Sequence, residues 1–420
     1  MRRRVVVTGI GVVTPLGDDP DKVMQQLMEG STAIGKTTRF DTTGLRADTA
    51  AELPSFEPGR YAISPRDTFI LDVWQQYVVA AAELAVRDAE LPLARNEISS
   101  KDRAEPGHPR YGASVGTAYL SGAFLAEQLY KLRDTGPRGV SPRLLPSTVP
   151  NGATSVVSIR YGLRGPLITV SSASAAGTDC VIAAYDRIRQ GRADVMLAGG
   201  GEAGVNLPTV VALSRLGTIS PTGACRPFDQ DRDGTVIGEG AAILVLEEYE
   251  HARRRGARIQ GELLGYGQRG DAFDLAELPA AAPSHIDCLH EALDDAGISP
   301  SDVGYVNVHG TGTVSNDRAE AHAVRTVFGT GPDAPYVGSV KGSTGHMGGG
   351  AGAFEIIVAM LAGSRGEVPP TVGLTNPAED CTLRHVIGKG ISADVPYAVS
   401  AGNGLGGNCS ALVIRGTADR

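Results

Sequence analysis

The chain has 420 residues, 42% of them hydrophobic and 20% charged, a globular balance that suits one large domain or two fused halves. Its formal net charge of −8 provides no broad basic field, which argues against nucleic acid as a partner. Five scattered cysteines without a CxxC pair indicate reduced thiols in a cytoplasmic protein, with neither a disulfide framework nor a zinc site.

The first element is a short apolar run, which we interpret as a buried strand. The run MRRRVVVTGIGVVTPLG is broken by glycines and by Pro15 before the apolar core of a signal peptide could form. No later stretch reaches about 18 consecutive apolar residues, so the sequence predicts no membrane span.

Short runs rich in Val, Ile and Leu alternate with helical periodicities along the chain. The runs are typical of strands buried on both faces. We expect strands at 5–8, 167–170, 195–198, 242–246, 305–308, 336–340, 397–400 and 411–414, and helices at 69–88, 178–190, 286–296, 319–328 and 352–362. This alternation predicts an α/β fold.

A faint internal repeat divides the chain. LITVSSASAAGTDCVIAAYDRI and PYVGSVKGSTGHMGGGAGAFEIIVAML share a plan of strand, small polar bend, glycine and helix, and each is followed by a strand ending in Ala-Gly. We therefore predict two related βαβ halves, residues 1–255 and 256–420, meeting around one site. Segments 31–65 and 97–150, rich in Pro, Gly and charge, are predicted excursions that form cap or dimer-contact loops.

Ser174 lies between a predicted strand and a helix beginning near Ala176. A helix N-terminus stabilises a thiolate or an acyl oxyanion, and a drop of roughly two pKa units would make a cysteine there a usable nucleophile. A hydroxyl would need depression by about 8 units, or about 11 kcal/mol, whereas a helix end supplies at most about 2 kcal/mol. Ser174 is therefore either an ordinary N-cap serine or a nucleophile that needs a general base.

Two glycine-rich loops follow predicted strands and carry histidine. His309 opens HGTGT, where Thr311 and Thr313 offer hydroxyls, and VKGSTGH carries Lys341 and His346. The two histidines occupy matching positions at strand ends, which favours a shared site. The strand before Lys341 and the glycine after it, Gly342, indicate that the Lys341 ammonium is partly buried.

Metal binding is the rival use of two histidines. The sequence has no HExxH spacing and no third ligand near them, so no metal site is predicted. The remaining histidines are expected in loops or on polar helix faces without a functional role: His108, His251, His285, His290, His322 and His385.

Several motifs in order resemble the elongating β-ketoacyl-acyl-carrier-protein synthases. They are VVVTGIGVVTPLG, GRADVMLAGGGEA, RPFDQDRDGTVIGEGAAILVLEE, HGTGT, and VKGSTGH followed by AGAFE, and the resemblance runs from residue 4 to about 416. It implies a thiolase-like fold with a layered α/β/α/β/α core. It also implies decarboxylative condensation of an acyl chain with a malonyl thioester, in fatty acid or type II polyketide synthesis.

The resemblance assigns roles to the singled-out residues. Ser174 occupies the position of the family's active-site cysteine, because this chain has ASAAGT where the family commonly has ACAAGT. His309 and His346 correspond to the histidines that hold the malonyl carbonyl and stabilise the enolate, and Lys341 to the lysine that supports the second histidine. The implied binders of the phosphopantetheine arm are Thr311 and Thr313, and the implied structural neighbour of the lysine is Glu355.

The C-terminal loop departs from the family pattern. Where the family usually has GFGGTN, this chain has GNGLGGNCS, which places Leu405 at the gate, next to the oxyanion position, and Asn403 before it. A smaller gate implies a different acyl pocket or gating motion. The tail SALVIRG resembles the type II polyketide branch.

Three interpretations of Ser174 stay open. It is a Cys→Ser replacement that stops turnover, a natural acyltransferase nucleophile that carries an oxygen ester, or a mark of a non-condensing subunit of the chain-length-factor type. The family implies an acyl carrier protein as partner, with its phosphopantetheine arm as substrate carrier and no bound cofactor. It also implies a homodimer or a heterodimer with a related subunit. Basic side chains that could meet an acidic carrier protein lie at Arg253 to Arg258 and at Lys131, Arg133, Arg138 and Arg143, although both groups also suit a solvated helix face.

Overall fold

The computed structural model describes residues 3–53, 55–102, 107–119 and 122–417. Its main sheet has ten strands in the order β10–β9–β13–β14–β8–β1–β7–β6–β4–β5. Their bounds are Val5–Val13 (β1), Tyr111–Gly116 (β4), Leu167–Ile168 (β5), Val195–Glu202 (β6), Gly240–Glu248 (β7), Gly261–Gly270 (β8), Val303–Asn307 (β9), Tyr336–Gly338 (β10), Tyr397–Gly404 (β13) and Asn408–Gly416 (β14). Two small pairs join Gly35–Lys36 (β2) to Thr49–Ala50 (β3) and Glu367–Val368 (β11) to Ile391–Ser392 (β12).

The strand order repeats within the main sheet. One half reads β5–β4–β6–β7–β1 and the other β10–β9–β13–β14–β8, which is the same order when each half is numbered along the chain. In both, the three strands at the outer end are parallel, and the next two are antiparallel to their neighbours. The halves meet where β1 pairs with β8. The predicted pseudo-repeat is confirmed, while the boundary between residues 255 and 256 stays a prediction.

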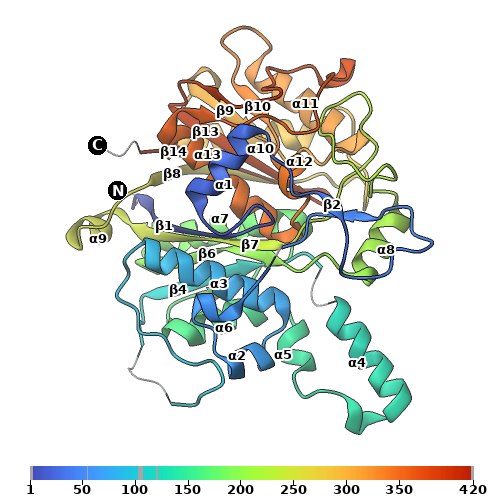
Figure 1. Cartoon of the computed structure of the whole chain (residues 1–420). Helices are drawn as coiled ribbons and strands as arrows, with labels where there is room; N and C mark the ends of the chain where they lie inside the picture. Colours follow the sequence, from blue (N-terminus) through green and yellow to red (C-terminus); the bar gives the residue numbers. More distant parts are fainter. Residues whose placement is uncertain (1–2, 54, 103–106, 120–121, 418–420) are drawn as a thin grey trace.

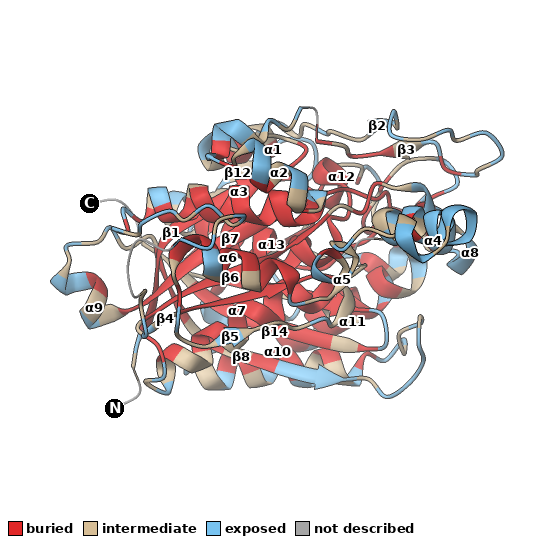
Figure 2. Cartoon of the chain, turned by 90° about the horizontal axis from the view of Figure 1, so that it is seen from below, coloured by how far each residue is buried: buried red, intermediate tan, exposed pale blue. Residues whose placement is uncertain are grey.

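Helices complete five layers (Figure 1). The helices Val73–Asp88 (α3) and Gly152–Tyr161 (α6) cover one outer face, and Pro283–Ala296 (α10) and Val314–Phe328 (α11) cover the other. Between the halves lie Ala176–Arg189 (α7) and Ala351–Arg365 (α13), which contact strands on both sides and each other. The predicted layered core is therefore confirmed. Figure 2 shows that burial is concentrated in these central layers.

The remaining helices are short or peripheral. They are Pro20–Glu29 (α1), Pro65–Ile70 (α2), Gly122–Thr135 (α4), Leu144–Thr148 (α5), Leu207–Leu216 (α8), Tyr249–Arg254 (α9) and Lys341–Thr344 (α12). In Figure 1, α4 projects away from the layered body. Among the described residues, no helix combines the length and apolar character that a bilayer crossing requires.

Three sequence expectations need correction. The strand expected at 167–170 is only Leu167–Ile168, and it lies at the sheet edge with Leu167 48% exposed rather than buried. The predicted excursion 97–150 contains β4, which pairs on both sides within the first half, and its residues 103–106 and 120–121 lie outside the described residues. The sequence also gave no signal for β8, because glycines and polar residues interrupt GELLGYGQRG.

Candidate active site

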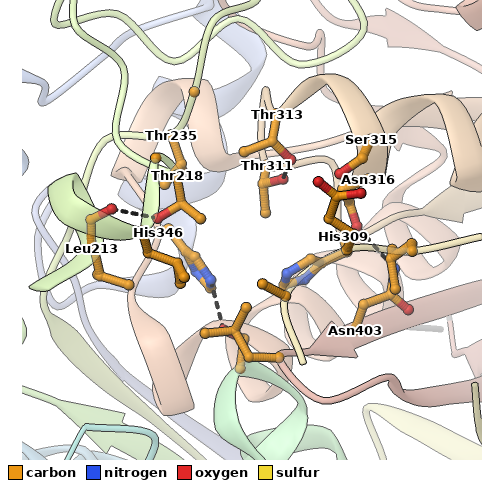
Figure 3. A pocket seen from close by; sticks show the side chains of 18 of the residues that line it. Leu213, Thr218, Thr235, His309, Thr311, Thr313, Ser315, Asn316, His346 and Asn403 are labelled. Atoms are coloured by element: carbon orange, nitrogen blue, oxygen red, sulfur yellow. Dashed lines mark hydrogen bonds between the residues drawn. The ribbon is translucent and has the colours of Figure 1, made fainter. Parts of the chain in front are cut away.

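A cavity of about 480 Å³ opens where strand ends of both halves converge. Ser174, His309 and His346 line it together, and Figure 3 shows both imidazoles pointing into the same space. The Oγ atom of Ser174 lies 2.8 Å from Nε2 of His346, and the two imidazole centroids are 5.1 Å apart with planes at 84°. One small carbonyl group could therefore contact all three side chains.

Ser174 is placed by a short 3₁₀ turn, Ala173–Ala175, that runs directly into α7. The backbone of Ala173 is left-handed, with φ of 52°, a conformation that side chains other than glycine seldom adopt. Ser174 is only 6% exposed, yet it lines the cavity. The expected position at a helix N-terminus is therefore what the structure has.

His309 follows β9 and is fixed by its own main chain. The N–H groups of His309 and Gly310 donate to the two carboxylate oxygens of Glu320 on α11, at 2.8 and 2.7 Å. Gly310 adopts a φ of 43°, and an added Cβ would lie 2.5 Å from the side chain of Ser339, so only glycine fits. The turn thereby directs the imidazole into the cavity.

Lys341 is more deeply buried than the sequence indicated, with 1% of its surface exposed. Its ammonium donates to a carboxylate oxygen of Glu355 and, at 2.5 Å, to the main-chain oxygen of His309. The contact is thus with the first histidine, whereas the resemblance implied support of the second. The reason is local: α12 starts at Lys341, three residues after the end of β10, and β10 pairs with β9, which leads into His309.

Burial and a nearby positive charge keep both imidazoles neutral. Desolvation lowers the pKa of His309 well below its usual value, and the positive charge of Lys341 lowers it further. Desolvation and then Lys341 lower the pKa of His346 in the same way. Within the described part of the chain, neither Nδ1 atom has a hydrogen-bond partner. Neutral imidazoles can accept a proton from a hydroxyl or donate N–H to a carbonyl oxygen.

Two family models account for most of the sequence. The β-ketoacyl synthase N-terminal domain matches residues 2–252, and the β-ketoacyl synthase C-terminal domain matches residues 260–375. This chain belongs to the β-ketoacyl synthase family.

Relatives of known identity are similar along the whole length. The 3-oxoacyl-[acyl-carrier-protein] synthase 2 of Coxiella burnetii is 35% identical over 418 residues, covering 98% of each chain, and that of Staphylococcus aureus strain COL is equally similar. Among solved structures, the ishigamide ketosynthase/chain length factor superposes with a TM-score of 0.91 at 34% identity, covering 100% of both chains. A type II polyketide ketosynthase bound to its acyl carrier protein, AntDE:AntF, gives a TM-score of 0.87 at 31% identity, also over 100% of both chains.

The two threonines and the loop around Leu405 line the same cavity of this β-ketoacyl synthase. Thr311 and Thr313 share a hydrogen bond of 2.9 Å between their hydroxyls. Leu405 is 37% exposed at the cavity, whereas Asn403 is buried and donates to Asn316 at 3.2 Å. All the predicted site residues except Lys341 and Glu355 thus face one space, and those two lie behind it.

Sequence reasoning missed a layer of buried acidic residues beneath the loops. Burial raises the pKa of Glu320 to about 7 and that of Asp317 to about 6. Asp317 accepts hydrogen bonds from the main-chain N–H groups of Phe228, at 2.8 Å, and Gly312, at 3.2 Å. The available signal was the pair of acidic residues, Asp317 and Glu320, in the segment that follows HGTGT; both are buried in the structure.

One expectation about the other histidines was wrong. His285 lies in the first turn of α10 and is only 6% exposed, so it is a core residue rather than part of a polar face. By contrast, His290 on the same helix is exposed as expected. The five cysteines are free and buried.

Proposed function

We propose that the chain is a β-ketoacyl-acyl-carrier-protein synthase in fatty acid or type II polyketide synthesis. It decarboxylates a malonyl thioester with His309 and His346 and receives the acyl chain as an oxygen ester on Ser174. The observation that carries the proposal is the 2.8 Å contact between Ser174 Oγ and His346 Nε2 in the cavity that His309 also lines.

Decarboxylation needs hydrogen-bond donors where negative charge develops. When the carbon–carbon bond to the carboxylate breaks, its electron pair moves into the thioester carbonyl, carbon dioxide leaves and an enolate remains. The neutral imidazoles of His309 and His346 donate N–H to that oxygen, and each such donor contributes about 10²–10³ in rate. The burial of both rings makes these hydrogen bonds stronger than they would be in water.

Acylation of Ser174 needs a general base, because the helix N-terminus alone does not lower the pKa of the hydroxyl enough. His346 Nε2 accepts the hydroxyl proton as Oγ attacks the incoming thioester, and the thiol of the carrier arm leaves with that proton. The enolate carbon then attacks the ester carbonyl, the ester bond breaks, and Oγ takes up a proton from solvent that His346 delivers. Because an alkoxide leaves less readily than a thiolate, this condensation is slower than that of a cysteine form.

The carrier arm would enter past the threonine hydroxyls. Thr311 and Thr313 suit its amide groups, and Arg318, which lines the same cavity and is exposed, suits its phosphate. This assignment uses an acyl carrier protein as partner, as named for the relatives, and no resident cofactor. The two basic groups suggested by sequence are less suitable, because Lys131, Arg133 and Arg253 each pair with a neighbouring acidic side chain.

Pairing with a second subunit is part of the proposal. The edge strand β5 exposes Leu167, and α4 exposes Leu125, Leu129 and Leu132. Exposed apolar side chains and an unpaired strand edge are typical of a pairing surface. A homodimer and a heterodimer with a ketosynthase-like subunit both fit.

A second candidate function is that of a non-condensing subunit of the chain-length-factor type. The hydroxyl in place of a thiol at residue 174 favours it. The two buried imidazoles that converge on that hydroxyl favour the synthase instead.

Intact-mass measurement of the protein after incubation with acyl-carrier-protein thioesters separates these functions. We expect a slowly formed acyl adduct on the protein and a faster one on the Ser174→Cys variant, with Ser174→Ala as the unreactive control. Malonyl thioester should be decarboxylated by all three forms. If the Ser174→Cys variant gained no adduct and no form released carbon dioxide, the synthase proposal would be wrong and the non-condensing subunit would stand.

A further inference from the structure

A second cluster of reactive side chains lies outside the catalytic cavity. Asp271 follows β8, His285 lies in the first turn of α10, and Cys409 is the second residue of β14. Their ligand atoms all lie within 4.8 Å of one another. The mechanism proposed above uses none of these three residues.

The cluster is closed to solvent and incompletely satisfied. The side chain of Asp271 has no exposed surface, and that of His285 is 6% exposed. Among the described residues, neither carboxylate oxygen of Asp271 has a hydrogen-bond partner. A buried carboxylate without donors is costly, since the low dielectric of the interior leaves its charge uncompensated. The Asp271 carboxylate is therefore an unpartnered buried ligand that a cation could use.

The ligand atoms lie close to the separations that one tetrahedral zinc ion requires. Cys409 Sγ lies 3.4 Å from His285 Nδ1, and that nitrogen lies 3.9 Å from Asp271 Oδ1. Zinc bonds of about 2.3 Å to sulfur and 2.0–2.1 Å to nitrogen or oxygen place tetrahedral ligands roughly 3.3–3.5 Å apart. The sulfur–nitrogen pair is already at that separation, and the Asp271 carboxylate would have to move closer to His285 from 3.9 Å.

We propose that Asp271, His285 and Cys409 bind one zinc ion. A thiolate, an imidazole and a carboxylate are the ligand types that select zinc, and the two anionic ligands neutralise its charge in a buried site. On binding, the Cys409 thiol gives up its proton to solvent. An adjoining cavity of about 20 Å³, lined by His285 and Cys409, has room for one water as the fourth ligand.

The site would hold the gate loop. The main-chain N–H of Asp271 donates to the carbonyl of Gly407 at 2.9 Å, and Cys409 follows that glycine by two residues. Asn403 lines both the small cavity and the catalytic one. Zinc would therefore tie β8, α10 and β14 together beside Gly407, two residues after Leu405, and it would make this loop stiffer.

Metal analysis of the full chain tests this inference without any measurement of activity. After reconstitution with zinc and removal of free metal, we expect about one zinc per chain. Replacement with cobalt should produce the near-ultraviolet charge-transfer absorption of a thiolate–cobalt bond. Cys409→Ala should abolish that absorption and His285→Gln should weaken zinc binding by at least about tenfold, whereas Cys225→Ala, a buried cysteine elsewhere, should change neither.

The unaltered protein decides the matter even if a variant does not fold. A chain that retains no zinc after reconstitution, or that binds cobalt without the thiolate absorption, would overturn the site. Equal zinc content in the Cys409→Ala variant and the parent would also overturn it. Failure of acyl transfer to Ser174 would leave all of these metal readouts unchanged.

Discussion

The two helices of the central layer begin in different ways, although the halves that supply them share one topology. In the first half, the turn before α7 presents Ser174 to the cavity. In the second half, the turn before α13 is Gly348–Gly350, and the reactive side chain is His346, further upstream. An added Cβ on Gly177 of α7 would lie 2.6 Å from the carbonyl oxygen of Gly349, so the helix starts touch through backbone. In the proposed function, one half thus supplies the acyl acceptor, Ser174, and the other supplies the proton acceptor, His346.

The largest expected effect comes from replacing His346, which separates its proposed role from that of Ser174. His346→Ala should lower malonyl thioester decarboxylation by about 10³-fold, because it removes one of two donors to the enolate in a buried site. Ser174→Ala should leave that rate nearly unchanged, since the hydroxyl acts only in acyl transfer. Release of labelled carbon dioxide measures both variants. His290→Ala, an exposed histidine on α10, is the control, and an equal loss in Ser174→Ala would contradict the assignment.

The buried ion pair of the second half gives the next effect. Lys341→Met leaves Glu355 charged and unpaired in the core, so the free energy of unfolding should fall by about 3–5 kcal/mol. Urea denaturation measures the change. Lys131→Met removes the exposed pair with Glu127 and should cost less than about 1 kcal/mol. A Lys341 variant as stable as the Lys131 variant would show that the pair does not hold the second half together.

The contact between the two helix starts can be tested by a single methyl group. Gly177→Ala should lower the free energy of unfolding by about 2 kcal/mol, because its Cβ meets main-chain atoms of Gly349 and Ala353. Gly122→Ala in α4 is the matched helical control. Its nearest neighbour would be 3.7 Å away, so helix propensity should stabilise it by up to about 1 kcal/mol. Thermal unfolding compares the two, and destabilisation of both alike would remove the packing argument.

The smallest effect concerns the acidic residue behind His309. The folded state raises the pKa of Glu320 from 4.5 to about 7, so the folded chain binds more protons than the unfolded one between these values. Stability therefore falls as the pH rises through this window, by about 1 kcal/mol for each pH unit from this group. Glu320→Gln should remove that part of the slope. Denaturation at pH 5 and pH 6 measures it, and an unchanged slope would show that Glu320 stays ionised in the fold.

The sequence was most informative at the loops that line the cavity, where the backbone makes tight turns that favour glycine and other small residues. The strand-end loops with His309 and His346, and the junction carrying Ser174, were found because glycines and small residues mark them. These features also indicated the repeated halves. Here the local signal and the three-dimensional role coincide.

The sequence was least informative where burial arises only from tertiary packing. Asp317 and Glu320 appear as ordinary polar positions on a helix, and nothing local shows that main-chain N–H groups will meet them. His285 was assigned to a polar face because its partners, Asp271 and Cys409, are 14 and 124 residues away. Strand β8 was missed because its pairing with β1 and β14 compensates for a weak strand pattern.

The left-handed backbone of Ala173 has a consequence for anyone who redesigns this enzyme. The left-handed conformation costs an L-amino acid about 1–2 kcal/mol, so the surrounding packing must hold Ala173 in it. Gly404 has no side chain and so leaves space for the methyl group of Ala173. Glycine at residue 173 would relieve the torsional strain and make the chain more tolerant of further mutation. It would also free the Ser174 hydroxyl to move away from His346 Nε2, so the added stability would loosen the contact on which the proposed acyl transfer depends.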